Sequence, residues 1–166
     1  MNFAQDAQDP KKARRRPLCY FLILTLGVGA VSSLFTTQQI PGWYSQLLRP
    51  TFAPPDWVFA PVWTLLYILM AIAGWRVWEK TGLKSLAMAS FALQLALNFA
   101  WCVLFFAMHQ IGIALVEILV LDLAILATAL LFFRHDRAAG LLFLPYLAWT
   151  VFASLLTRAI WRLNGG

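Results

Sequence analysis

Charged residues are scarce in this chain. They make up 12% of its 166 residues, whereas 61% are hydrophobic; a soluble domain carries roughly 25% charged residues. Cysteine is also rare, and Cys19 and Cys102 stand far apart in the sequence. Two isolated cysteines exclude a disulfide framework and a cysteine-based zinc site. These shortages exclude the soluble and the disulfide-rich classes of protein.

Catalytic motifs are lacking as well. The sequence has no nucleotide-binding loop, no nucleophile elbow, no metal-binding motif and no Ser–His–Asp set. We therefore expect no conventional hydrolytic or redox enzyme, no metal site and no required cofactor.

Long apolar runs are what the chain has instead. A helix needs about 20 consecutive apolar residues to cross a bilayer. These runs do not alternate apolar and polar residues, so they do not form the strands of a membrane barrel. We predict an all-α integral membrane protein, a bundle of five transmembrane helices over residues 18–166, preceded by a basic, disordered tail over 1–17. The runs cover roughly 18–37, 57–78, 84–106, 111–133 and 138–160.

The net charge of +6 comes from basic residues that cluster between the runs. Cytoplasmic segments of membrane proteins carry an excess of Lys and Arg. This distribution predicts a cytoplasmic N-terminus, an external C-terminus and a lipid bilayer, not a nucleic acid, as the partner. The residues that set the orientation are Lys11, Lys12, Arg14, Arg15, Arg16, Arg76, Lys80, Lys84, Arg134 and Arg137.

The first connection, about 36–57, is the longest and is rich in aromatic residues and proline. Its continuation into the second run reads WYSQLLRPTFAPPDWVFAPVWTLLY from Trp43 to Tyr67. Trp and Tyr often settle at the headgroup level of a membrane, and this explains Trp57 and Trp75. A proline-stiffened loop is not needed for that purpose. We therefore predict that Trp43, Tyr44 and Trp63 belong to a lid over an apolar pocket.

The third run places Gln94, Asn98 and Trp101 on one helical face. An Asn at membrane depth is costly unless it is hydrogen-bonded. Two explanations stay open: a bond between helices that serves packing, or a role in orienting a ligand. The opposite face carries small residues every four positions, which favours a homodimer, although packing within the chain is the alternative. These residues are Ala92, Ala96 and Ala100.

Polar residues also occur in the fourth run. Glu117 and Asp122 are five residues apart and so do not form one paired site. Carboxylates at membrane depth usually face the bundle interior; Asp122 is deeper, and we expect it to be protonated or to meet a partner on another helix. His109 is interpreted as an interfacial residue, with a haem-ligand role as the alternative. In the fifth run, Trp149 and Ala153 share a face, and a flat ligand would fit between Trp149 and Trp63.

Four ordered motifs together resemble the translocator protein family, also called tryptophan-rich sensory proteins or TspO/MBR. They are WY-x-x-L-x-x-P-x-x-x-PP-x-W from Trp43, P-x-W-x-x-L-Y from Pro61, QLALN-x-x-W from Gln94, and PYLAW from Pro145. The resemblance spans essentially the whole chain after residue 17. Each motif alone is weak, but four in this order on five spans are highly specific.

The resemblance implies a five-helix bundle, usually dimeric, that binds tetrapyrroles such as protoporphyrin IX or haem, and in some members cholesterol. Family ligands lie beneath the first connection. Light-dependent porphyrin breakdown has been proposed for some members, with Trp63 and Trp149 at the matching positions. By alignment, the ligand-binding residues are Trp43, Tyr44, Pro54, Phe59, Trp63, Asn98, Trp101, Trp149 and Ala153.

Three positions depart from the family pattern. Phe52 replaces a common Trp, Thr157 replaces a frequent Asn, and Arg158 stands where many animal members have a Tyr within a proposed cholesterol motif. That motif is absent, which argues against sterol recognition by this route. The basic tail favours a bacterial cell membrane. The expected functions are a porphyrin receptor or carrier, a light-dependent porphyrin-degrading enzyme, or a regulatory partner of another membrane complex.

Overall fold

The computed structural model describes residues 10–166, with side chains from residue 17 onward. Within this part of the chain, five helical segments are long and apolar enough to cross a membrane, and no strand occurs. The predicted five-helix architecture is therefore confirmed.

The helical elements follow one another with short connections. The fifth span is divided between α6 and α7, because Pro145 at the start of α7 has no N–H to continue the hydrogen bonding of α6. The elements are α2 (Pro10–Gln39), the π-helical turn η1 (Ile40–Tyr44), the 3-10 turn η2 (Asp56–Val58), α3 (Phe59–Thr81), α4 (Leu86–Cys102), the π-helical turn η3 (Val103–Ala107), α5 (Ile111–His135), α6 (Arg137–Leu142) and α7 (Leu144–Leu163).

The first connection is shorter than the sequence suggests. Residues 36–57 were expected to form a loop, but α2 continues to Gln39, and η1 follows directly to Tyr44 with a kink at Gly42. Residues 45–55, called the lid below, lie between η1 and η2, and most of them are not helical. The expected disordered tail, 1–17, lies partly outside the described residues, and the chain is helical from Pro10 onward.

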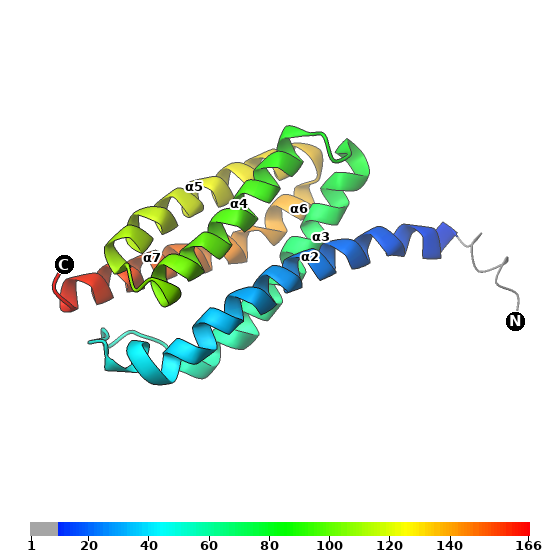
Figure 1. Cartoon of the computed structure of the whole chain (residues 1–166). Coiled ribbons are helices and arrows are strands. Elements are labelled where there is room, and N and C mark those ends of the chain that lie inside the picture. Colours follow the sequence, from blue (N-terminus) through cyan, green and yellow to red (C-terminus); the bar gives the residue numbers. More distant parts are fainter. Residues whose placement is uncertain (1–9) are drawn as a thin grey trace, which may run out of the picture.

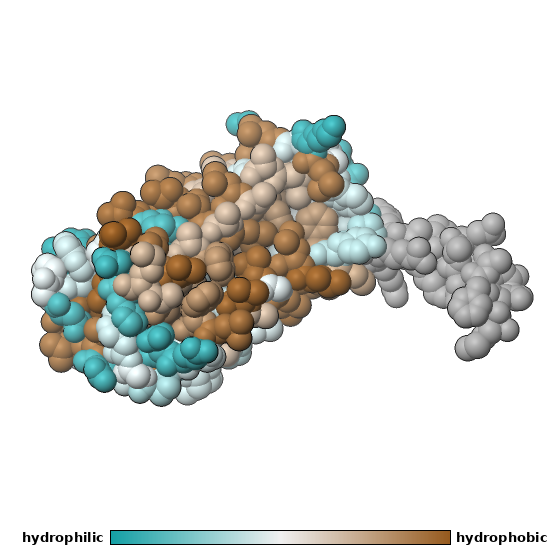
Figure 2. Space-filling model, viewed as in Figure 1, coloured by the Kyte–Doolittle hydropathy of each residue, from teal (hydrophilic) through white to brown (hydrophobic). Residues whose placement is uncertain are grey.

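The lid and the C-terminal end of α7 lie at the same end of the bundle, and α2 starts at the opposite end (Figure 1). We call the first the lid end. We call the second the clamp end, because Asp136 holds α3 and the fifth span together there. Hydrophobic side chains cover most of the middle of the face in Figure 2, and hydrophilic ones gather toward both ends. This distribution fits a bundle that is surrounded by lipid at mid-height.

The half of the bundle at the clamp end is closely packed. The Phe91 ring lies 5.9 Å from the Phe132 ring, and Phe143 meets Phe132 edge-on at 5.1 Å. Helices α2 and α3 approach closely because residue 29 is a glycine: a Cβ there would lie 2.5 Å from the Tyr67 ring. The hydroxyl of Thr25 also donates to the Tyr67 carbonyl at 2.9 Å.

Asp136 fastens the clamp end. Its carboxylate accepts hydrogen bonds from Arg76 of α3 at 2.9 Å and from the Ala139 N–H at 3.0 Å, and Lys80 Nζ lies 2.9 Å away. Burial alone would raise the pKa of Asp136, but the bonds from Lys80, Ala139 and Arg76 hold it well below its usual range. The residue therefore caps α6 and ties the fifth span to α3.

Candidate functional site

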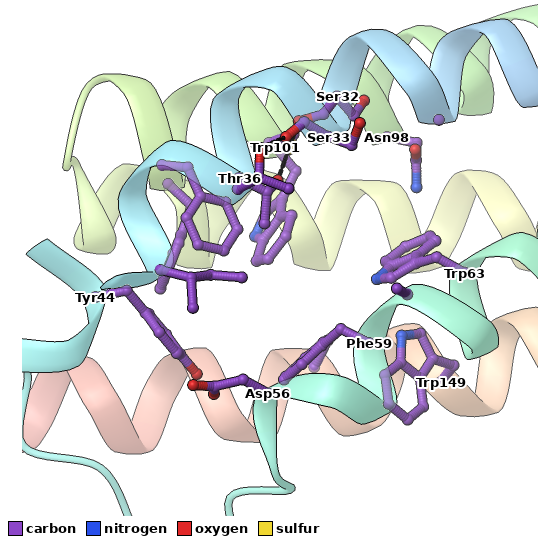
Figure 3. A pocket seen from close by; sticks show the side chains of 18 of the residues that line it. Ser32, Ser33, Thr36, Tyr44, Asp56, Phe59, Trp63, Asn98, Trp101 and Trp149 are labelled. Carbon is purple, nitrogen blue, oxygen red and sulfur yellow. Dashed lines mark hydrogen bonds between the residues drawn. The ribbon is translucent and has the colours of Figure 1, made fainter. Parts of the chain in front are cut away.

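A cavity of about 390 Å³ occupies the lid half of the bundle. Its walls come from α2, η1, η2, α3, α4, η3 and α7 (Figure 3), while α5 contributes no lining residue. A volume of this size falls within the roughly 300–1,000 Å³ of small-molecule sites. The lining is mainly apolar, with a few polar groups at defined positions.

One wall of the cavity is aromatic. Phe59 and Trp63 of α3 stand beside Trp149 of α7 (Figure 3), with the Phe59 and Trp149 rings 5.9 Å apart at 72°. The spacing of four residues predicted that Trp63 and Tyr67 share a face, and their rings are 5.7 Å apart. This wall offers flat, polarisable surfaces to a flat ligand.

A second aromatic surface comes from α4 and η3. Trp101 stacks on Phe105 with ring centres 5.2 Å apart and planes 20° from parallel. The π-helical turn η3 begins directly after Cys102, and π-bulges are frequent at functional sites. Phe105 and Phe106 of this turn line the cavity together with Trp101.

Asn98 closes the cavity toward the packed half. Its Oδ1 accepts a hydrogen bond from Tyr67 Oη at 2.7 Å, and its Nδ2 donates to Tyr146 Oη at 3.1 Å. The bond between helices that sequence analysis considered is therefore present. Asn98 also lines the cavity, so the expected ligand-orienting role stays a prediction.

Helix α2 lines the cavity with hydroxyl groups, which appear along its edge in Figure 3. Thr36 Oγ1 lies 3.2 Å from Cys102 Sγ on α4. Sequence analysis did not select these residues. The signal was available, because Ser32 and Thr36, and likewise Ser33 and Thr37, are four apart and share a helical face.

Three hydrogen-bond donors at the cavity are buried and have no partner among the described residues. They are the indole Nε1 atoms of Trp101 and Trp149 and the hydroxyl of Ser32. A buried donor without a partner costs roughly 1–3 kcal/mol. Because the accessible area of each atom is close to zero, none of the three faces the open cavity, and a ligand would reach them only after a side chain rotates.

The lid is fixed to the bundle at several points. Leu48 N–H donates to Asn164 Oδ1 and Asn164 Nδ2 donates to the Leu48 carbonyl, both at 3.0 Å. Arg49 of the lid forms an ion pair at 2.8 Å with Asp56, the first residue of η2. The side chain of Tyr44 points toward Asp56 at the same end of the cavity (Figure 3).

Trp43 and Pro54 lie outside the cavity lining. The Trp43 ring stacks on His109 at 4.1 Å and 17°, while Pro54 borders a small depression on the lid beside Arg49. Trp43 is turned away because it packs against the connection between α4 and α5. The other predicted residues all line the cavity: Tyr44, Phe59, Trp63, Asn98, Trp101, Trp149 and Ala153.

His109 and Gln94 also occupy defined positions. His109 Nε2 lies 3.1 Å from Gln39 Oε1, so the ring joins the end of α2 to the connection between α4 and α5. Gln94 is fully buried but does not line the cavity, although it was expected to share a face with Asn98. It lies one turn further into the packed half of α4.

The two carboxylates of α5 do not line the cavity. Asp122 accepts a hydrogen bond from Ser154 of α7 at 2.8 Å, so it meets a partner on another helix. Both Glu117 carboxylate oxygens are buried and have no hydrogen-bond partner among the described residues. Over the same residues, no group of three His, Cys, Asp or Glu side chains is arranged to hold a metal ion.

The positions that depart from the family pattern lie near the cavity. Thr157 lines it, whereas Arg158 is exposed on the next face of α7. Phe52 of the lid meets Phe152 edge-on at 6.3 Å. The lid therefore keeps an aromatic contact with α7.

Comparison with known proteins places the chain in a family. The TspO/MBR family model matches residues 21–162. A Tryptophan-rich protein TspO from Archaeoglobus fulgidus is 42% identical over 144 residues, covering 86% of this chain and 94% of the relative. A Tryptophan-rich sensory protein from Cereibacter sphaeroides is 39% identical over 144 residues, 87% of this chain and 90% of the relative. The Translocator protein of Sus scrofa is 36% identical over 151 residues, 89% of each chain. With these matches over most of its length and five membrane-spanning helices, the chain belongs to the TspO/MBR family.

Proposed function

We propose that this protein is a membrane receptor or carrier that binds a flat tetrapyrrole, protoporphyrin IX or haem, in the cavity beneath the lid. The observation that carries the proposal is the aromatic lining: Trp63 and Trp149 on one side and Trp101 on another. Aromatic side chains hold flat conjugated rings by offset stacking and edge contacts.

The polar groups of the cavity suit the same ligand. A protoporphyrin carries acidic side groups that accept hydrogen bonds, and a rotation of Trp101, Trp149 or Ser32 would turn an unpartnered buried donor toward the cavity that these residues line. Charge-assisted bonds to a carboxylate are stronger than neutral ones. Sterols, which are apolar with a single hydroxyl, would leave most of these donors without partners.

Titration with protoporphyrin IX in darkness tests this function. The purified protein should show saturable quenching of tryptophan fluorescence, and Trp63→Ala and Trp149→Ala should each weaken binding by about 1–2 kcal/mol. Trp57→Ala is the matched control, because Trp57 is 74% exposed and lies outside the cavity lining. If the wild-type protein and the three variants bind protoporphyrin IX with equal affinity, the cavity is not the binding site.

Light-dependent breakdown of bound porphyrin is the second candidate, favoured by the positions of Trp63 and Trp149 at the cavity. Illumination of the complex should then change the absorption spectrum of the porphyrin. The Trp variants should lose this change under conditions where they are still saturated with ligand. No spectral change in the wild-type complex beyond that of free porphyrin would exclude the candidate.

The proposed membrane is that of a bacterial cell, with the N-terminus in the cytoplasm. The support is the basic content of the clamp end, where Lys80, Lys84, Arg134 and Arg137 accompany the start of α2. Reporters fused to the two termini should give opposite readings. An external N-terminus would overturn this orientation.

A further inference from the structure

The cavity is most exposed along its side and not at the lid. Among its lining residues, those that are exposed all lie on α2 or α3. The lining residues contributed by α4, η3 and α7 are buried or half-buried. The exposed set is Leu26, Ala30, Ser33 and Thr37 of α2 with Ala60 and Thr64 of α3.

These exposed residues sit inside the membrane-spanning segments. The first span covers Pro17–Tyr44 and the second covers Asp56–Thr81. An opening between them within the spans faces lipid and not water. Gly29, one turn from Leu26, packs against Tyr67 and brings the two helices together near the clamp-end limit of the opening.

The hydroxyls at this opening are compatible with lipid. Each donates to a carbonyl of its own helix: Ser33 to Ala30 at 2.7 Å, Thr37 to Ser33 at 2.8 Å, and Thr64 to Ala60 at 2.8 Å. Hydroxyls bonded in this way are satisfied without water. Their oxygen atoms can still accept a hydrogen bond from a polar group of a ligand that moves through the opening.

The lid, by contrast, is closed by several contacts at once. Opening it toward water requires breaking the paired bonds of Leu48 and Asn164 and the ion pair of Arg49 and Asp56. The neighbouring stack of Trp43 on His109 holds η1 in place. The lateral opening requires none of these contacts to break.

We infer that the cavity is loaded from the bilayer through the gap between α2 and α3, so that its ligand is an amphiphile dissolved in lipid. The inference rests on the proposed function. It adds the route by which the ligand enters the cavity and the medium from which it enters. A flat amphiphile would pass between the hydroxyl-lined edge of α2 and the start of α3. Its apolar body would then reach Trp63 and Trp149.

The test measures the rate of loading. Wild-type protein in phosphatidylcholine vesicles is mixed with vesicles that contain protoporphyrin IX, and tryptophan quenching is followed in darkness. Ala30→Trp combined with Ala60→Trp narrows the gap. Ala127→Trp is the control, since Ala127 is exposed on α5 and does not line the cavity.

We expect the double variant to load at least tenfold more slowly, with a dissociation rate lowered in the same direction, because the gap is the path for both entry and exit. Ala127→Trp should load at the wild-type rate. Asn164→Ala and His109→Ala, which loosen the lid, should also leave the rate unchanged. The wild-type rate should follow the mole fraction of porphyrin in lipid and not its concentration in water.

Faster loading in the lid variants, with no slowing in the double variant, would overturn the inference and indicate access from water. Equal slowing by Ala127→Trp would overturn it as well, because the effect would not belong to the gap. Neither result affects equilibrium binding. Absence of saturable binding by the wild-type protein would instead count against the proposed function itself.

Discussion

Tyr67 of α3 donates a hydrogen bond to Asn98 of α4 at 2.7 Å, at the boundary between the packed half of the bundle and the cavity. On one side of this bond lie closely packed phenylalanines, and on the other lies the space that α2, α3, α4 and α7 enclose. Asn98 is 3% exposed, so its amide has exchanged water for two tyrosine hydroxyls.

Replacing Asn98 with Leu should lower the free energy of unfolding by about 2–3 kcal/mol, because two buried hydroxyls lose their partner. Tyr67→Phe removes one of these bonds and leaves fewer groups unsatisfied, so its cost should be smaller. Thermal unfolding in mild detergent measures both. If Asn98→Leu is as stable as wild type but binds no porphyrin, its role is ligand contact and not packing.

Asp136 predicts a dependence of stability on pH. Its folded-state pKa is held below the unfolded value of about 3.9. The contribution of Asp136 to the free energy of unfolding is therefore fully present above about pH 4. It is lost as the pH falls through the pKa of Asp136 in the folded state. Asp136→Asn should lower stability by about 2 kcal/mol at pH 7 and should flatten the acid limb of the profile.

Asp56→Asn is the matched control for that experiment. The side chains of Arg49 and Asp56 are 34% and 39% exposed, and exposed ion pairs contribute at most about 1 kcal/mol. The buried Asp136 carboxylate is only 5% exposed. Equal losses in the two variants would show that the Asp136 contacts add nothing beyond a surface pair.

The small-residue face of α4 supports a proposed homodimer. Ala92 and Ala96 are exposed and Ala100 is half-buried, so this face is largely free of packing within the chain. Ala96→Leu should separate two such faces and release monomers in mild detergent, while porphyrin binding persists. Size-exclusion chromatography with light scattering measures this. A variant that remains dimeric would place the interface elsewhere.

The sequence predicted the five spans because apolar length is a direct signal of membrane crossing. It overestimated the first connection, since Trp43 and Tyr44 lie in a π-helical turn whose backbone bonds leave no mark in composition. The division of the fifth span at Phe143 was likewise missed, although Pro145 marks it.

The cavity could be predicted only in part. Trp63, Trp149 and Asn98 were identified from helical spacing and family resemblance, and they line the cavity. The α2 wall was missed because Ser and Thr are common in membrane helices, so the shared face of Ser32 and Thr36 was not taken as a sign of a site. The Trp43–His109 stack depends on a turn between α4 and α5 in which His109 has a φ of 55°. No spacing rule predicts such a contact.

The most direct test of the proposed binding site is to fill the cavity. Ala153 of α7 lines the space beside Trp149, and Ala153→Trp should occupy the volume that a porphyrin needs. The variant should unfold at close to the wild-type temperature in detergent and show no saturable quenching by protoporphyrin IX in darkness. A folded Ala153→Trp protein that binds protoporphyrin IX with wild-type affinity would contradict the account.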